Sequence, residues 1–163
     1  MALTGAQDDA GRLVETYSSM LLRLACTRLE NHADAEDVVQ EVFLKLLTVR
    51  PAFRDAEHEK AWLIRTTLHR AADLRKAAAR RNVPLEEALL ASAPEPENQL
   101  LAAVRALPEK YGAVIHLHYY EGYSLKEIGK LLGLPAATVG TRLARGRAKL
   151  KELLGGTEYE RTV

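Results

Sequence analysis

The sequence predicts an all-α protein of two small helical domains joined by a linker, with a helix-turn-helix in the C-terminal domain. Aromatic residues make up only 6% of the 163 residues, and apolar side chains recur at helical spacing in both halves. No segment alternates between polar and apolar residues for long enough to predict a strand. Residues 82–99 contain three prolines and no basic residue. We therefore expect domains over residues 10–81 and 100–155, with 82–99 as an acidic linker.

Charge is distributed unevenly, although the net charge is only +1. Residues 60–81 carry a net +6 and residues 100–163 a net +4, whereas residues 1–59 carry −5 and residues 82–99 carry −4. Two basic blocks predict two separate contacts with nucleic acid, and the two acidic blocks predict surfaces of another kind.

Several classes of function are disfavoured by what the sequence contains. The single cysteine, Cys26, excludes an internal disulfide, and no cysteine and histidine residues have the spacing of a zinc site. His116 and His118 would diverge on a helix, so we expect no metal and no cofactor. We find no nucleophile with a base and no phosphate-binding loop, which argues against an enzyme. Without a signal peptide or a long apolar run, we expect a cytoplasmic protein with no membrane insertion.

The second predicted helix has an acidic exposed face. A helical pattern begins at Ala10 and breaks at residues 30–32, and Asp34 is the expected N-cap of the next helix, which extends to about Leu47. Val38, Val42 and Leu46 share its core-facing side. The opposite side is acidic and either solvated or in contact with a partner, and it contains Asp34, Asp37, Gln40, Glu41 and Leu44.

A third helix is predicted from about residue 57 to Arg81, with Leu63, Leu68 and Ala72 facing inward. Its other side is densely basic, with Thr67 among the cations. A helix of this kind is either solvated or bound to nucleic acid, and the local charge favours nucleic acid. The basic residues that we expect to contact DNA are Arg65, His69, Arg70, Arg80 and Arg81.

The C-terminal half predicts two helices joined by a tight turn. Ser124 and Glu127 have the spacing of a capping box, Gly133 suits a left-handed C-cap, and Pro135 prevents the first helix from continuing. A second helix then starts near Ala136. One of its faces combines hydroxyls with cations, which suit phosphates and base edges in the major groove, although a solvated cationic face is the alternative. This face contains Thr138, Thr141, Arg142, Arg145 and Lys149.

Three segments together resemble an extracytoplasmic-function (ECF) sigma factor of bacterial RNA polymerase, of the sigma-70 family. They are the acidic helix Asp34–Lys45, the basic helix from Ala61 to Arg81, and the stretch from Leu107 to Leu154. The resemblance implies that the acidic helix binds the clamp helices of the polymerase largest subunit. It implies that the basic helix reads and helps to melt the downstream (−10) promoter element, and that the helix-turn-helix reads the upstream (−35) element.

The resemblance also implies partners and no catalysis. The partners are core RNA polymerase, through its clamp helices and its flap region, promoter DNA, and an anti-sigma factor that holds the protein inactive. Departures from the family pattern are His69 in place of the usual Asn, Arg75, Ala79, and glycines at 140 and 146 in the last helix. Each glycine costs about 0.5–1 kcal/mol relative to alanine inside a helix, so the recognition helix is expected to be less rigid.

Two other classes of protein fit part of the pattern. A conventional helix-turn-helix regulator with an N-terminal dimerisation or sensing domain would bind duplex DNA alone, but it leaves the basic block at 60–81 and the acidic helix unexplained. A purely structural helical protein would make both basic faces solvated, and salt-dependent DNA binding would argue against it.

Overall fold

The computed structural model describes residues 2–80 and 96–155, and over these ranges the chain forms helices and turns without a strand. The N-terminal bundle consists of α1 (Ala2–Cys26), α2 (His32–Val49) and α3 (Ala56–Arg80). The C-terminal unit consists of α5 (Pro96–Ala106), α6 (Glu109–Ile115), the π-helical turn η1 (His116–Tyr120), α7 (Leu125–Leu132) and α8 (Ala136–Leu153). The predicted all-α class is confirmed.

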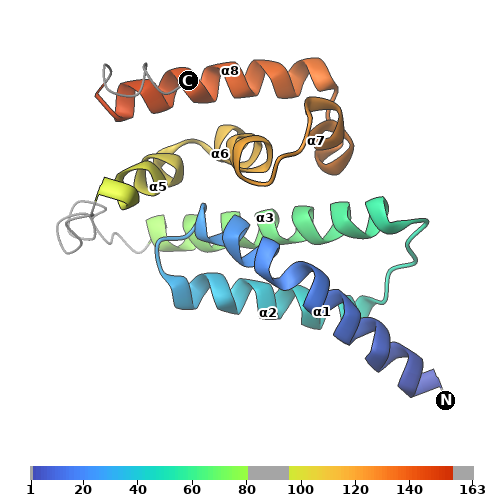
Figure 1. Ribbon diagram of the computed structural model, residues 1–163. Coiled ribbons are helices and arrows are strands. Elements are labelled where there is room, and N and C mark those ends of the chain that lie inside the picture. The colour runs from blue at the N-terminus through green and yellow to red at the C-terminus, as the bar shows by residue number, and fades with distance from the viewer. Residues whose placement is uncertain (1, 81–95, 156–163) are drawn as a thin grey trace.

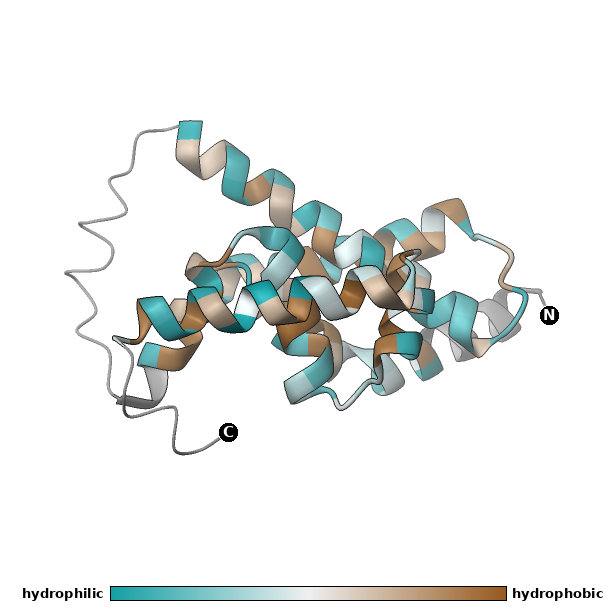
Figure 2. Ribbon diagram, turned by 90° about the horizontal axis from the view of Figure 1, so that it is seen from above, coloured by the Kyte–Doolittle hydropathy of each residue, from teal (hydrophilic) through white to brown (hydrophobic). Residues whose placement is uncertain are grey.

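The two groups of helices are stacked, and α3 of the bundle faces the C-terminal unit (Figure 1). In the bundle, α1, α2 and α3 pack against one another, and α7 of the C-terminal unit lies on α3. Helix α8 packs on α6 and α7 and lies on the side of the molecule farthest from α2 (Figure 1). Hydrophobic residues gather where the helices cross, and hydrophilic ones lie on the outer sides (Figure 2). Among the described helices, none combines the length and apolarity that crossing a bilayer requires.

The start of α2 differs from the prediction. Asn31, and not Asp34, is the N-cap: its backbone is extended and its side-chain oxygen accepts a hydrogen bond from the Ala33 N–H at 2.8 Å. The predicted cap at Asp34 is therefore wrong, because Asn31, three residues before it, already accepts from the free N–H of Ala33. Asp34 instead lies in the first turn, where its charge complements the positive end of the helix.

The buried face of α3 is rotated relative to the prediction. It contains Leu63, Ile64, Thr67 and Ala71, whereas Ala72 is only half-buried. Placing Thr67 among the surface cations was wrong: its hydroxyl donates to the Leu63 carbonyl at 2.8 Å, which satisfies the polar group inside the bundle. A threonine can therefore occupy this core position, although its polar hydroxyl group predicts a position on the surface.

The turn between α7 and α8 has the predicted geometry. The Glu127 N–H donates to the Ser124 hydroxyl at 3.1 Å, and the Ser124 N–H donates to the Glu127 carboxylate at 3.0 Å, which completes the capping box. Gly133 has a φ of 70°, the left-handed conformation that glycine adopts without strain. Pro135 precedes the first residue of α8, Ala136. These local signals fix where α8 begins.

Candidate nucleic-acid interface

An open hollow with cationic walls lies between α8 and the start of α6. Four of the five residues predicted on the cationic face of α8 line it, and they are Thr138, Thr141, Arg142 and Arg145. The fifth, Lys149, is exposed one turn beyond Arg145. Helix α8 therefore presents the predicted residues together, on an open surface that could contact DNA.

Helix α6 adds a cation that the sequence did not indicate. Lys110 and Tyr111 line the same hollow as Arg142 and Arg145. Because Lys110 belongs to another helix, the helical period of α8 could not reveal it. The only signal in the sequence is the position of Lys110 just after Pro108, at the start of a helix.

Arg65 lies at the junction between the bundle and the C-terminal unit. Its guanidinium donates to the Leu131 carbonyl at 2.7 Å and to the Lys130 carbonyl at 3.1 Å. Both carbonyls are in the last turn of α7, where no intrahelical N–H is left to satisfy them. In this arrangement, therefore, Arg65 holds α7 on α3.

The other cations of α3 have different surroundings. Arg70 forms an ion pair with Glu41 of α2, and the two line a second hollow that also contains His69 and Asp73. Arg80 is exposed at the end of α3, and Arg81 lies outside the described residues. The residues predicted to bind the downstream promoter element therefore have different surroundings. Arg65 contacts the C-terminal unit, Arg70 is in an ion pair, and Arg80 is at an exposed helix end.

The predicted partner-facing side of α2 is exposed along its length. Its members are Asp34, Asp37, Gln40, Glu41 and Leu44, and all five are exposed. Leu44 is 63% exposed, and Leu47, about one turn farther along the same side, is 45% exposed. Carboxylates beside exposed leucines are typical of a protein-docking surface. Glu41 connects this surface to the basic face of α3 through its ion pair with Arg70.

The candidate surfaces are cationic or acidic rather than chelating. Within residues 2–80 and 96–155, no group of three or more histidine, cysteine, aspartate or glutamate side chains is arranged to hold a metal ion. His116, one of the two histidines considered above, is buried at the junction of the two groups of helices.

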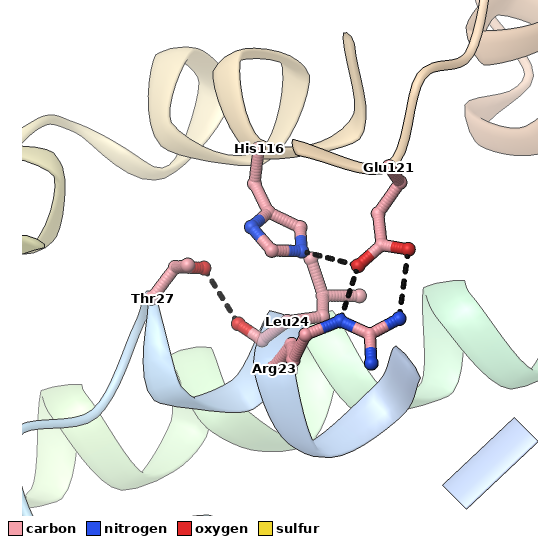
Figure 3. Close-up of polar contacts among 5 residues, drawn as sticks. All are labelled: Arg23, Leu24, Thr27, His116 and Glu121. Carbon is pink, nitrogen blue, oxygen red and sulfur yellow. Dashed lines mark hydrogen bonds and ion pairs between the residues drawn. The ribbon is translucent and has the colours of Figure 1, made fainter. Parts of the chain in front are cut away.

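A chain of three side chains joins α1 to the C-terminal unit (Figure 3). The Arg23 guanidinium donates twice to the Glu121 carboxylate, at 2.9 and 3.0 Å, and His116 Nε2 lies 3.2 Å from the same carboxylate. Burial, opposed by Glu121, holds the pKa of His116 below its ordinary value of 6.5. Although burial raises it, the pKa of Glu121 lies below its ordinary value because Arg23 binds the charged form.

These two shifts predict that the protein loses stability in acid. Below pH 6.5 the unfolded chain protonates at His116 more readily than the folded chain does, so the free energy of unfolding falls. Glu121 adds to the loss below pH 4.5. We expect the melting temperature to fall between pH 7.5 and 5.5. His116→Gln, which keeps a donor for Glu121 but cannot titrate, should show a smaller fall; an equal fall in both proteins would contradict the role of His116.

Comparisons with known proteins agree with the two-part architecture. Residues 13–81 match the sigma-70 region 2 family, and residues 97–150 match the sigma-70 region 4 family. The ECF RNA polymerase sigma factor SigW of Bacillus subtilis is 29% identical, and the similarity covers 92% of this chain and 91% of that protein. SigM of Mycobacterium tuberculosis, also an ECF RNA polymerase sigma factor, is 31% identical over 88% of this chain and 76% of its own length.

A solved structure supports the same fold. The structure of CnrH in complex with the cytosolic domain of CnrY matches with a TM-score of 0.62 and 27% sequence identity. The match covers 91% of this chain and 89% of CnrH.

Proposed function

The chain belongs to the ECF sigma factors of bacterial RNA polymerase, and from this membership we propose how its surfaces divide the work of initiation. The observation that carries the proposal is the exposed acidic and apolar face of α2 beside the basic face of α3, with a second cationic face on α8. Such a chain acts as a non-catalytic initiation factor that directs core polymerase to promoters in the bacterial cytoplasm.

Each surface then has one role. Residues 10–81 form the unit that binds polymerase and the downstream element, residues 82–99 are the linker, and residues 100–155 form the unit that binds the upstream element. The acidic face of α2 docks on the clamp helices, and its residues are Asp34, Asp37, Gln40, Glu41 and Leu44. The downstream element is held by Arg65, His69, Arg70, Arg80 and Arg81. The upstream element is held by Thr138, Thr141, Arg142, Arg145 and Lys149, with Lys110 of α6 as a further phosphate contact.

We also propose an inhibitory partner. CnrH, whose fold matches, was solved in complex with the cytosolic domain of another protein. An anti-sigma factor that covers the docking face of α2 would keep this chain from polymerase. Such a partner should contact the exposed Leu44 and Leu47, because apolar side chains at this exposure are the strongest anchors that the face offers.

Co-elution with core polymerase tests the proposal. The protein is mixed with bacterial core RNA polymerase, without DNA, and passed over a size-exclusion column. We expect wild-type protein to co-elute and Asp37→Lys to weaken the association at least about tenfold, because it reverses a charge at the centre of the acidic face. Asp37 is exposed, so the helical content and melting temperature should not change.

The matched control is Glu15→Lys, which makes the same charge change on an exposed residue of α1. It should co-elute as wild type does. Failure of the wild-type protein to co-elute, or equal weakening by Glu15→Lys and Asp37→Lys, would contradict docking through α2.

A further inference from the structure

We infer that Arg147 and Tyr119 form a second phosphate-binding site, on the side of α8 opposite the cationic hollow, so that both strands of the upstream element hold α8. This inference rests on the proposed binding of that element by α8 and deepens it. Arg147 touches the phosphate, and Tyr119 positions Arg147. Neither residue belongs to the set that the sequence predicted to bind DNA.

Arg147 and Tyr119 come from two elements that pack together. The Arg147 guanidinium donates to the Tyr119 hydroxyl at 2.9 Å and so joins α8 to the π-helical turn η1. Both side chains reach solvent, since Arg147 is exposed and Tyr119 is 53% exposed. A long side chain loses rotamer freedom when it binds a ligand, and a bond that fixes its direction beforehand reduces this loss. The pair is therefore pre-organised for binding.

The tyrosine is itself held in place by its neighbours in the turn. The His118 ring lies edge-on to the Tyr119 ring, with 4.8 Å between the centroids, and His118 Nδ1 lies 2.7 Å from the Tyr123 carbonyl oxygen. A carbonyl only accepts, so His118 carries its proton on Nδ1 and donates this bond. Contacts that run from Tyr123 through His118 and Tyr119 therefore determine where the Arg147 guanidinium lies.

The chemistry of the pair suits a phosphate. Tyr119 is neutral, so its bond leaves the positive charge of Arg147 intact. The tyrosine oxygen accepts from Arg147 and keeps its O–H as a donor, so guanidinium N–H groups and a hydroxyl lie side by side. Residues 136–151 of α8 contain no aspartate or glutamate, so no carboxylate on this part of the helix competes for the guanidinium. An anion with several acceptor oxygens fits such a group of donors.

Arg147 leaves α8 on the side away from the hollow. Arg145 and Arg147 are two residues apart, which places them about 200° apart around the helix. Gly146 between them is buried against α6, where a Cβ would lie 3.1 Å from Ile115 Cγ1. Arg145 lines the hollow on one side of this contact, and Arg147 emerges on the other. Helix α8 therefore carries cations on two opposite sides.

The dimensions of the major groove match this arrangement. Lys149 extends the side with the hollow, and Lys151 lies one turn beyond Arg147 on the other side. A helix with its side chains is about 10–12 Å across and the groove is about 12 Å wide, so cations on opposite sides of one helix reach phosphates of opposite strands. Ala144 and Ala148 are exposed between the two sides, and their short side chains let α8 lie close to the base edges.

Variants of the polymerase holoenzyme test the second site on a promoter duplex selected from random DNA by the wild-type holoenzyme. Arg147→Ala should weaken binding to the selected duplex and to its single-base variants alike, about tenfold, and reduce the slope of log affinity against log salt by about 1. Arg147→Lys keeps the charge and should restore the slope. Tyr119→Phe removes only the hydroxyl and should weaken binding about threefold without a change in slope. Circular dichroism should show unchanged helical content in all three variants.

Neutral phosphates identify the strand that each cation contacts. Methylphosphonate groups are placed one at a time along both strands of the upstream element in the selected duplex. We expect wild-type binding to weaken at positions on both strands. Arg147→Ala should become insensitive at a position on one strand, and Lys149→Ala at a position on the other. Insensitivity on the same strand in both variants, or an unchanged pattern in Arg147→Ala, would overturn the inference.

A matched control is Lys130→Ala, which removes the same charge from an exposed residue in the last turn of α7. It should leave both the affinity and the salt slope as in wild type. If Arg147→Ala weakens co-elution with core polymerase in the absence of DNA, the pair binds protein and the inference is overturned. If Lys149→Ala also leaves DNA binding unchanged, the proposed upstream contact of α8 fails. A loss of binding with Lys149→Ala but not with Arg147→Ala overturns the second site alone.

Discussion

Gly129→Ala is expected to destabilise the C-terminal unit by about 1–3 kcal/mol and to abolish binding of the upstream element. A Cβ at this position would lie 2.6 Å from the Leu134 carbonyl oxygen. That oxygen belongs to the backbone of the turn, whose Leu134 N–H donates to the Gly129 carbonyl at 2.8 Å. The backbone at Gly129 and the backbone of the turn are held together by this hydrogen bond, so neither can move aside on its own. The added methyl group must therefore change the angle between α7 and α8.

The control for this variant is Gly140→Ala in α8. A Cβ there would lie 3.7 Å from Leu125 Cδ1, an ordinary contact, and alanine is the better helix former. We expect Gly140→Ala to raise the free energy of unfolding by up to about 1 kcal/mol, opposite in sign to Gly129→Ala. Denaturant unfolding of both variants measures this difference. Equal effects of the two substitutions would show that crowding at the turn is not what requires Gly129.

Elements with strong local signals could be predicted from the sequence. The limits of α7 and the start of α8 follow from Ser124, Gly133 and Pro135, each of which acts on backbone within a few residues of itself. The first residue of α2 was harder to predict, because Asn31 and Asp34 are both good N-caps and only the path of the chain decides between them. Helix α1 begins at Ala2, eight residues before the predicted start, since the polar residues there are compatible with a helix.

The contacts between the two units could not be predicted. An arginine that donates to a carbonyl leaves no pattern in the sequence, because every residue has a carbonyl. Arg65 was therefore grouped with the DNA-facing cations of α3. The spacing of Arg28 predicts that it shares the apolar face of α1, but nothing in the sequence indicates that its guanidinium donates to the Val104 and Leu107 carbonyls. Lys110 was missed for a related reason: it joins the cationic hollow through packing of α6 on α8, which the period of one helix does not show.

Arg142→Ala and Arg145→Ala are each expected to weaken binding of the upstream element by about 1–3 kcal/mol, or roughly 5- to 150-fold. Both residues line the hollow on α8, and Arg142 is half-buried there, which limits the positions that its guanidinium can adopt. A guanidinium restrained in this way is suited to bidentate contact with a guanine edge. Binding is measured with polymerase holoenzyme on a promoter selected from random DNA by the wild-type protein.

Lys149→Ala distinguishes base readout from attraction to phosphate. Lys149 is exposed beyond the hollow, and the loss of a phosphate contact should weaken binding to all sequences about equally and reduce the slope of log affinity against log salt by about 1. Loss of a base contact should instead reduce the difference in binding affinity between the selected promoter and its single-base variants. Arg142→Ala that weakens all sequences equally would remove Arg142 from the base-reading set and leave it a phosphate contact.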